Sequence, residues 1–147
     1  MLLMSTQLAQ PAPPVPDLLR RSVAEAVGTG LLLATVVGSG IMAERLAGGQ
    51  VALALLANTV ATGAGLIALI LTFGPISGAH LNPAVTLSDA AVGKTRWRDV
   101  PAYVLAQIAG AFGGVAAAHA MFGEPVFSRS LHERSGGGQM PSEFIAT

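Results

Sequence analysis

A polar run interrupts an apolar chain at residues 77–86, and its residue types suit the recognition of a small solute. The run reads Ser-Gly-Ala-His-Leu-Asn-Pro-Ala-Val-Thr. Asparagine is a favoured N-cap and proline is favoured at the first helical position, so Asn82-Pro83 predicts the start of a helix. The apolar stretch that follows ends at Val92, too short to cross a bilayer core of about 30 Å. We therefore expect a re-entrant half-helix whose positive N-terminal end faces a solute path inside a membrane.

Other kinds of chemistry find no support in the sequence. The chain has no cysteine, and its three histidines (His80, His119 and His132) match no metal-ligand spacing. No arrangement of serine, histidine and aspartate suggests a nucleophile with its base. The formal net charge is zero, and there is no basic block of the kind that binds nucleic acid. We expect no metal, no cofactor, no nucleic-acid partner and no enzymatic activity.

The composition places the chain in a lipid bilayer. Of its 147 residues, 52% are hydrophobic and 11% are charged, and the mean hydropathy of +0.61 is too high for a soluble domain of this size. Three stretches reach the length of about 20 apolar residues that a span requires: residues 22–43, 51–73 and 101–122. The expected fold is an all-α membrane protein with three transmembrane helices plus a re-entrant loop and half-helix over residues 76–92.

The segments outside this unit are interpreted from their composition. Residues 1–21 are rich in proline and are expected to form a disordered lead, without the order of basic and apolar residues that a signal peptide requires. Residues 123–141 are expected to form a polar extracellular or periplasmic loop. Residues 142–147 are expected to begin a fourth, truncated span.

The distribution of basic residues predicts the orientation. One side of the membrane would carry five of them, namely Arg20, Arg21, Lys94, Arg96 and Arg98, and the other side would carry Arg45, Arg129 and Arg134. Short cytoplasmic loops collect Lys and Arg. We therefore expect a multi-pass protein of the cell membrane with a cytoplasmic N-terminus.

Two further patterns concern assembly. Small residues recur four apart in the third span, at Ala106, Gly110, Gly114 and Ala118, a spacing that allows close helix contact in lipid. Residues 142–147 also echo residues 24–29, with a small residue, a glutamate, two apolar residues, a small residue and a threonine. A glutamate at the start of an apolar segment is costly unless it is paired. The echo indicates that a second, inverted copy of the unit begins there.

The run at residues 77–86 resembles the first half of an aquaporin, a member of the major intrinsic protein family. The resemblance covers residues 20–147 and includes Ala24-Glu25, Gly28-Thr29, Ala106-Gln107 and Gly110-Ala111. Residues 36–42, with residues 52–62, are most similar to bacterial aquaglyceroporin-like members. The resemblance implies a passive channel for water and small neutral solutes, such as glycerol or undissociated metalloid acids such as arsenite. It also implies a homotetramer with one pore in each subunit.

The resemblance assigns roles to the residues of the re-entrant loop. It implies that Asn82 donates hydrogen bonds to the solute, that Pro83 starts the half-helix and that Ala84 packs against a second half-helix. His80 and the backbone carbonyls of Gly78, Ala79 and His80 would line the cytoplasmic half of the pore.

Three residues outside the loop also receive roles from the resemblance. Glu25 would be a buried brace that accepts hydrogen bonds from the loop amides, and Gln107 would brace the loop from the third span. Thr62 lies 20 positions before Asn82, at the second-span position of the family's outer constriction. A threonine there implies a wider and more polar opening than an aromatic residue would leave.

The chain holds one Asn-Pro-Ala motif and three spans, where the family has two motifs and six spans. Several explanations remain open. The chain is a fragment of a longer product, or two oppositely inserted copies pair as a dimer, or a partner chain supplies the second half. A further alternative is a non-conducting membrane remnant.

Overall fold

Four α-helices make up the fold of this chain in a computed structural model that describes residues 16–126. They are α1 (Leu18–Leu46), α2 (Val51–Ser77), α3 (Pro83–Ala91) and α4 (Val100–Phe122), and no strand occurs among the described residues. Helices α1, α2 and α4 are long and apolar enough to cross a membrane, whereas α3 has nine residues. The expected all-α class with three spans and one half-helix is confirmed.

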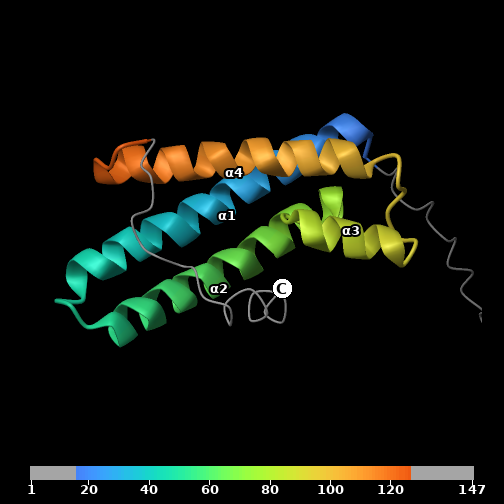
Figure 1. The fold of residues 1–147 in the computed structure, drawn as a ribbon. Coiled ribbons are helices and arrows are strands. Elements are labelled where there is room, and N and C mark those ends of the chain that lie inside the picture. The colour runs from blue at the N-terminus through green and yellow to red at the C-terminus, as the bar shows by residue number, and fades with distance from the viewer. Residues whose placement is uncertain (1–15, 127–147) are drawn as a thin grey trace, which may run out of the picture.

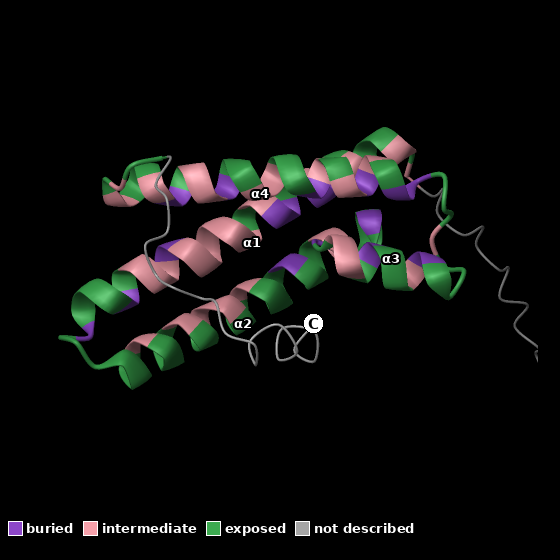
Figure 2. Ribbon diagram, viewed as in Figure 1, coloured by how far each residue is buried: buried purple, intermediate pink, exposed green. Residues whose placement is uncertain are grey.

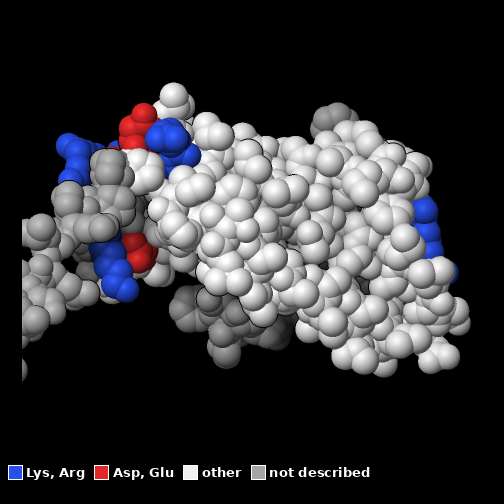
Figure 3. All heavy atoms as spheres, turned by 180° about the vertical axis from the view of Figure 1, so that it is seen from behind, with Lys and Arg blue, Asp and Glu red and all other residues white. Residues whose placement is uncertain are grey.

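Helix α1 is the central element of the arrangement. It packs against α4 on one side and against α2 on the other, and α3 packs against α4 near the start of that helix (Figure 1). Buried residues gather where α1, α3 and α4 meet, whereas most of α2 is exposed (Figure 2). Charged side chains lie at the two ends of the molecule, with a wide uncharged belt between them (Figure 3). This is the surface of a membrane protein.

The first helix is longer than the span expected from hydropathy. It begins at Leu18, four residues earlier, because Asp17 acts as the N-cap and its Oδ1 accepts a hydrogen bond from Arg20 N at 2.8 Å. It continues past the polar pair Glu44-Arg45 to Leu46. Hydropathy locates the membrane-embedded part of this helix, and the cap determines where the helix itself begins.

Helix α2 also runs further than expected. It passes Pro75 and ends at Ser77, whereas the expected span ended at residue 73 and the re-entrant element began at residue 76. A proline in the last turn removes one backbone donor without requiring the helix to stop there. The helix ends because Gly78 adopts a left-handed conformation with φ of 93°, and its N–H donates to Gly74 O.

The small residues of α4 allow an unusually close approach to α1. A Cβ atom added at Gly110 would collide with Ala26 O, and one added at Gly114 would collide with Gly30 O. Backbone thus lies against backbone along this seam. In lipid, helix association rests on such packing.

Several expectations fall outside the described residues. These are the disordered lead as far as residue 15, the polar loop from residue 127 onward and the start of a fourth span at residues 142–147.

Candidate functional site

A short loop between α2 and α3 forms the centre of the candidate site. After Gly78, both Ala79 and Leu81 have positive φ values, of 49° and 52°. Non-glycine residues adopt this region at a cost of about 1–3 kcal/mol each, and they persist there only when their surroundings impose it. The loop must therefore be held in place by other parts of the chain.

Glu25 of α1 holds the loop by accepting four hydrogen bonds. Its Oε1 accepts from Ser77 Oγ at 2.6 Å and from His80 N at 3.0 Å. Its Oε2 accepts from Leu81 N at 2.7 Å and from Gln107 Nε2 at 2.8 Å. The residue is fully buried, and a carboxylate offers about four lone-pair positions. Every acceptor position of Glu25 is therefore occupied, three of them by donors of residues 77–81 and one by Gln107 of α4.

Gln107 and Thr86 extend this network to the half-helix. Gln107 Nε2 also donates to Thr86 Oγ1 at 2.9 Å, and Thr86 Oγ1 donates to Asn82 O at 3.2 Å. Thr86 is fully buried in α3 and Gln107 is almost fully buried in α4. Helices α1, α3 and α4 are therefore joined through a single polar cluster.

Three residues of this cluster, Ser77, Tyr103 and Thr86, were not among the site residues expected from the sequence. Ser77 Oγ accepts from Ala79 N at 3.1 Å, and Tyr103 Oη donates to Ser77 O at 2.8 Å. Tyr103 is 1% exposed. A buried tyrosine usually directs its hydroxyl to a hydrogen-bond partner, and this preference was the available indication that Tyr103 belongs to the cluster.

His80 is engaged within the protein through both ring nitrogens. Nδ1 lies 3.1 Å from Thr86 Oγ1, and Nε2 lies 3.5 Å from Asp89 Oδ2. The ring also packs against Tyr103, with centroids 5.3 Å apart. These contacts orient the side chain, and the pore-lining role expected for it stays a prediction.

Leu81 anchors the loop in a cluster of apolar side chains. It is 3% exposed and packs in a cluster with Leu69 and Ala79, beside Phe73. A Cβ atom added at Gly28 would lie 2.5 Å from Leu81 Cδ2. The glycine in α1 therefore provides the space that the side chain occupies.

The start of α3 presents an asparagine amide to the surface. Asn82 is exposed, and its Oδ1 accepts from Ala84 N at 2.8 Å as the N-cap, directly before Pro83 at the first helical position. Its Nδ2 donates to no described residue. Within the described part of the chain, the carbonyl oxygens of Gly78, Ala79 and His80 also accept no hydrogen bond. Donors and acceptors are thus both available along this loop.

Thr62 lies apart from this cluster. It stands 15 positions before Ser77 in α2, which at about 1.5 Å per residue is about 22 Å along the helix. Its Oγ1 donates to Asn58 Oδ1 at 3.1 Å, and Asn58 Nδ2 donates to Val36 O at 3.3 Å. Asn58 was not singled out from the sequence, although an amide four residues from a hydroxyl in an apolar span indicates such a pair.

The described site contains no cluster of metal ligands. Over residues 16–126 there is no group of three or more His, Asp or Glu side chains that could hold an ion. The chemistry of the described site is that of hydrogen-bond donors and acceptors beside a helix N-terminus.

Comparison of the sequence with known proteins identifies relatives of this chain. Residues 15–147 match the family model described as major intrinsic protein. The chain is 56% identical over 130 residues to the aquaglyceroporin AqpS of Rhizobium meliloti (strain 1021), covering 88% of this chain and 55% of the relative. It is 42% identical over 93 residues to the probable aquaporin NIP7-1 of Arabidopsis thaliana, covering 63% of this chain and 33% of the relative. It is 38% identical over 122 residues to aquaglyceroporin-3 of Trypanosoma brucei brucei, covering 82% of this chain and 36% of the relative. The chain thus spans about half or less of the length of these relatives.

Proposed function

This chain belongs to the major intrinsic protein family, and on that premise we propose that it supplies one half of a passive channel for water and small neutral solutes. Glycerol and undissociated metalloid acids such as arsenite are the proposed permeants, and two relatives are named aquaglyceroporins. The family is one of transport channels and not an enzyme class. The observation that carries the proposal is the half-helix α3, which begins at an exposed Asn82 whose amide nitrogen has no partner among the described residues.

The geometry at Asn82 supports the proposed role of its amide in orienting a solute. Because the Oδ1 atom is committed to Ala84 N, rotation of the side chain is restricted and the two N–H groups keep a constant direction. They donate to an oxygen of water or of an alcohol. The positive end of α3 disfavours cations at the same place. The free carbonyls of Gly78, Ala79 and His80 are the proposed acceptors along the approach.

The complete pore is proposed to need a second repeat, supplied in the same product or by a partner chain. A second half-helix would pack against Ala84 and complete the wall opposite Asn82. The proposed assembly is a homotetramer in the cell membrane with a cytoplasmic N-terminus. Support for the orientation comes from the basic residues at the end where α1 and α4 begin, against the single Arg45 at the other end of the described chain (Figure 3).

Stopped-flow light scattering on proteoliposomes tests the proposal. We expect a chimera of this chain with the uncovered portion of the Rhizobium meliloti relative to raise water and glycerol permeability well above that of empty liposomes. The 147-residue chain alone is expected to match empty liposomes. Conduction by the chain alone would favour the homodimeric pore, and a folded chimera that conducts neither solute would favour the non-conducting remnant.

The variant Asn82→Asp tests the role of the amide donors within this chimera. The aspartate keeps an oxygen that caps α3 and loses both N–H donors, so we expect glycerol and water permeability to fall about tenfold, the equivalent of one hydrogen bond to the solute. Gln50→Glu is the control, because it makes the same amide-to-acid change at an exposed position that forms no cap hydrogen bond. Equal permeability of both variants and the parent would refute a donor role for Asn82.

The variant Thr62→Phe tests the proposed constriction. A phenyl ring narrows a pore far more than a hydroxyl does, so we expect glycerol permeability of the chimera to fall about tenfold and water permeability to fall less. Thr59→Phe is the control, because Thr59 is exposed on the same helix and bonds only to Leu55 O. If the two variants reduce glycerol permeability equally, Thr62 does not line the path.

A further inference from the structure

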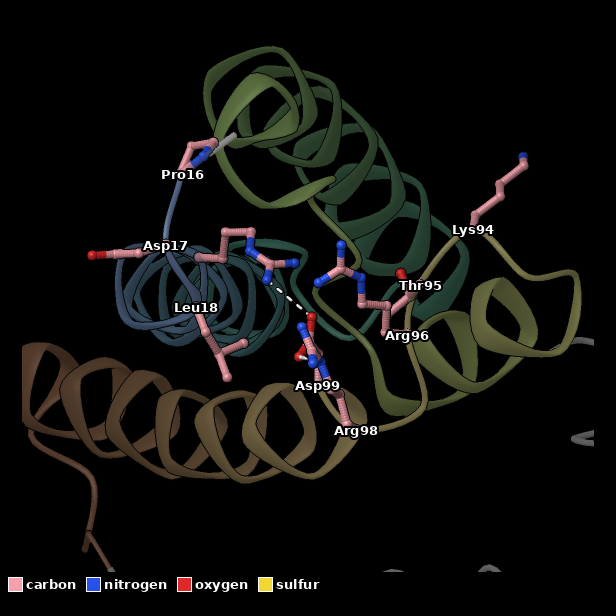
Figure 4. A pocket seen from close by; sticks show the side chains of 9 residues that line it. Pro16, Asp17, Leu18, Lys94, Thr95, Arg96, Arg98 and Asp99 are labelled. Carbon is pink, nitrogen blue, oxygen red and sulfur yellow. Dashed lines mark hydrogen bonds and ion pairs between the residues drawn. The ribbon is translucent and has the colours of Figure 1, made fainter. Parts of the chain in front are cut away.

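A polar cavity of about 700 Å³ lies at the end of the molecule where α1 and α4 begin (Figure 4). Four cationic residues line it, namely Arg21, Lys94, Arg96 and Arg98, together with the carboxylates of Asp17 and Asp99. Positive groups therefore exceed negative groups by two. The starts of two helices add their positive dipole ends to this excess.

The carboxylates do not neutralise the cavity. Asp17 caps α1, and its side chain points away from the space between the helices (Figure 4). Asp99 serves two partners, with Oδ2 at 3.0 Å from Arg21 Nη2 and Oδ1 at 3.7 Å from Arg98 Nε. Within residues 16–126, no carboxylate lies within ion-pair distance of Lys94 or Arg96.

Two of the arginines that line the cavity have donors that no described residue accepts. Arg21 Nε is buried and has no hydrogen-bond partner among the described residues. Arg96 points into the space beside Asp99, whereas Lys94 extends outward (Figure 4). Guanidinium groups bind phosphate oxygens through pairs of N–H donors. The cavity therefore matches a phosphate-bearing anion.

An apolar groove of about 510 Å³ adjoins this cavity, and Pro16 lines both. The groove runs between α1 and the end of α2 and is lined by Leu19, Val23, Phe73 and Ile76, among others. A cationic cavity beside an apolar groove, at the end of the uncharged belt, matches a molecule with a phosphate head and a hydrocarbon tail.

We propose that this cavity binds the phosphate headgroup of an anionic phospholipid, with an acyl chain of that lipid in the adjoining groove. The proposal is independent of solute conduction. It assigns a structural lipid to the surface where α1, α2 and the loop before α4 meet.

Native mass spectrometry of the purified chain in detergent tests the proposal, with dioleoylphosphatidylglycerol and dioleoylphosphatidylcholine as probes. We expect phosphatidylglycerol to bind at about tenfold lower concentration than phosphatidylcholine. In Arg96→Gln, we expect this tenfold preference to be lost. The emission of Trp97, the one tryptophan of the chain, reports on the loop that carries Arg96. It should change over the same range of phosphatidylglycerol concentration.

Controls distinguish this site from general attraction between charges. Arg45→Gln removes one positive charge at the opposite end of the helices, where Arg45 pairs with Glu124, and should leave lipid binding unchanged. Arg98→Gln is a second test variant, since this side chain is largely exposed and its change should not affect folding. Equal effects of Arg45→Gln and Arg96→Gln would overturn the proposal, as would equal binding of the two lipids. Saturation by sn-glycerol 3-phosphate at the same concentration would overturn the assignment to a lipid.

Discussion

Replacing Glu25 with alanine is expected to lower the free energy of unfolding by about 3–5 kcal/mol, the range seen when one partner of a buried polar network is removed. The change removes the acceptor of four hydrogen bonds, which come from the Ser77 hydroxyl, the Gln107 amide and the backbone N–H groups of His80 and Leu81. It also releases a loop that holds two non-glycine residues at positive φ. Denaturation in mixed micelles, followed by circular dichroism, measures the loss.

Hydrogen exchange gives a local test of the same prediction. The amides of His80 and Leu81 should lose protection in Glu25→Ala, whereas amides in the middle of α1 should change little. Glu25→Gln keeps the size of the side chain but places an N–H group against these donors, so it too should destabilise the loop. Glu44→Ala is the matched control, because Glu44 is exposed on the same helix. Unchanged protection at His80 and Leu81 would show that the loop holds its shape without Glu25.

Hydropathy and local helix rules predicted the elements of this fold. The three spans follow from the lengths of the apolar stretches, and α3 follows from Asn82-Pro83, a cap followed by a proline at the first helical position. The helices α1 and α2 extend beyond the expected spans. Asp17 and Gly78 determine where α1 begins and where α2 ends, and both act through local backbone hydrogen bonds rather than through hydropathy.

The polar cluster around the loop was predicted only in part. Glu25 stands out because a carboxylate in an apolar span requires partners. The other members of the cluster, Ser77, Thr86 and Tyr103, are residue types that occur in many spans without any such role. Their contribution depends on how α1, α3 and α4 are placed in space, with Tyr103 lying 26 positions from Ser77. Sequence spacing within one helix carries no information on such a contact.

Placing leucine at Gly114 is expected to separate α1 from α4 and to destabilise the fold by about 3 kcal/mol or more, the upper end of the range for overpacking. A single Cβ atom at this position already collides with Gly30 O, and the same holds for Gly110 against Ala26 O. Backbone atoms cannot move aside as a flexible side chain can. Because Glu25 and Gln107 lie on these two helices, the separation should also break the hydrogen bond between them.

Gly113→Leu provides the matched control for this prediction, because the same substitution at the neighbouring position meets no atom within 4 Å of the added Cβ. Leucine has a higher helix propensity than glycine, so this variant should be as stable as the parent or slightly more stable. Denaturation in mixed micelles and hydrogen exchange at Leu81 measure both variants. If Gly114→Leu matched Gly113→Leu in both measurements, the close α1 to α4 seam would not support the loop. A loss confined to Gly114→Leu would mean that the small residues of α4 position the loop between α2 and α3 through Glu25.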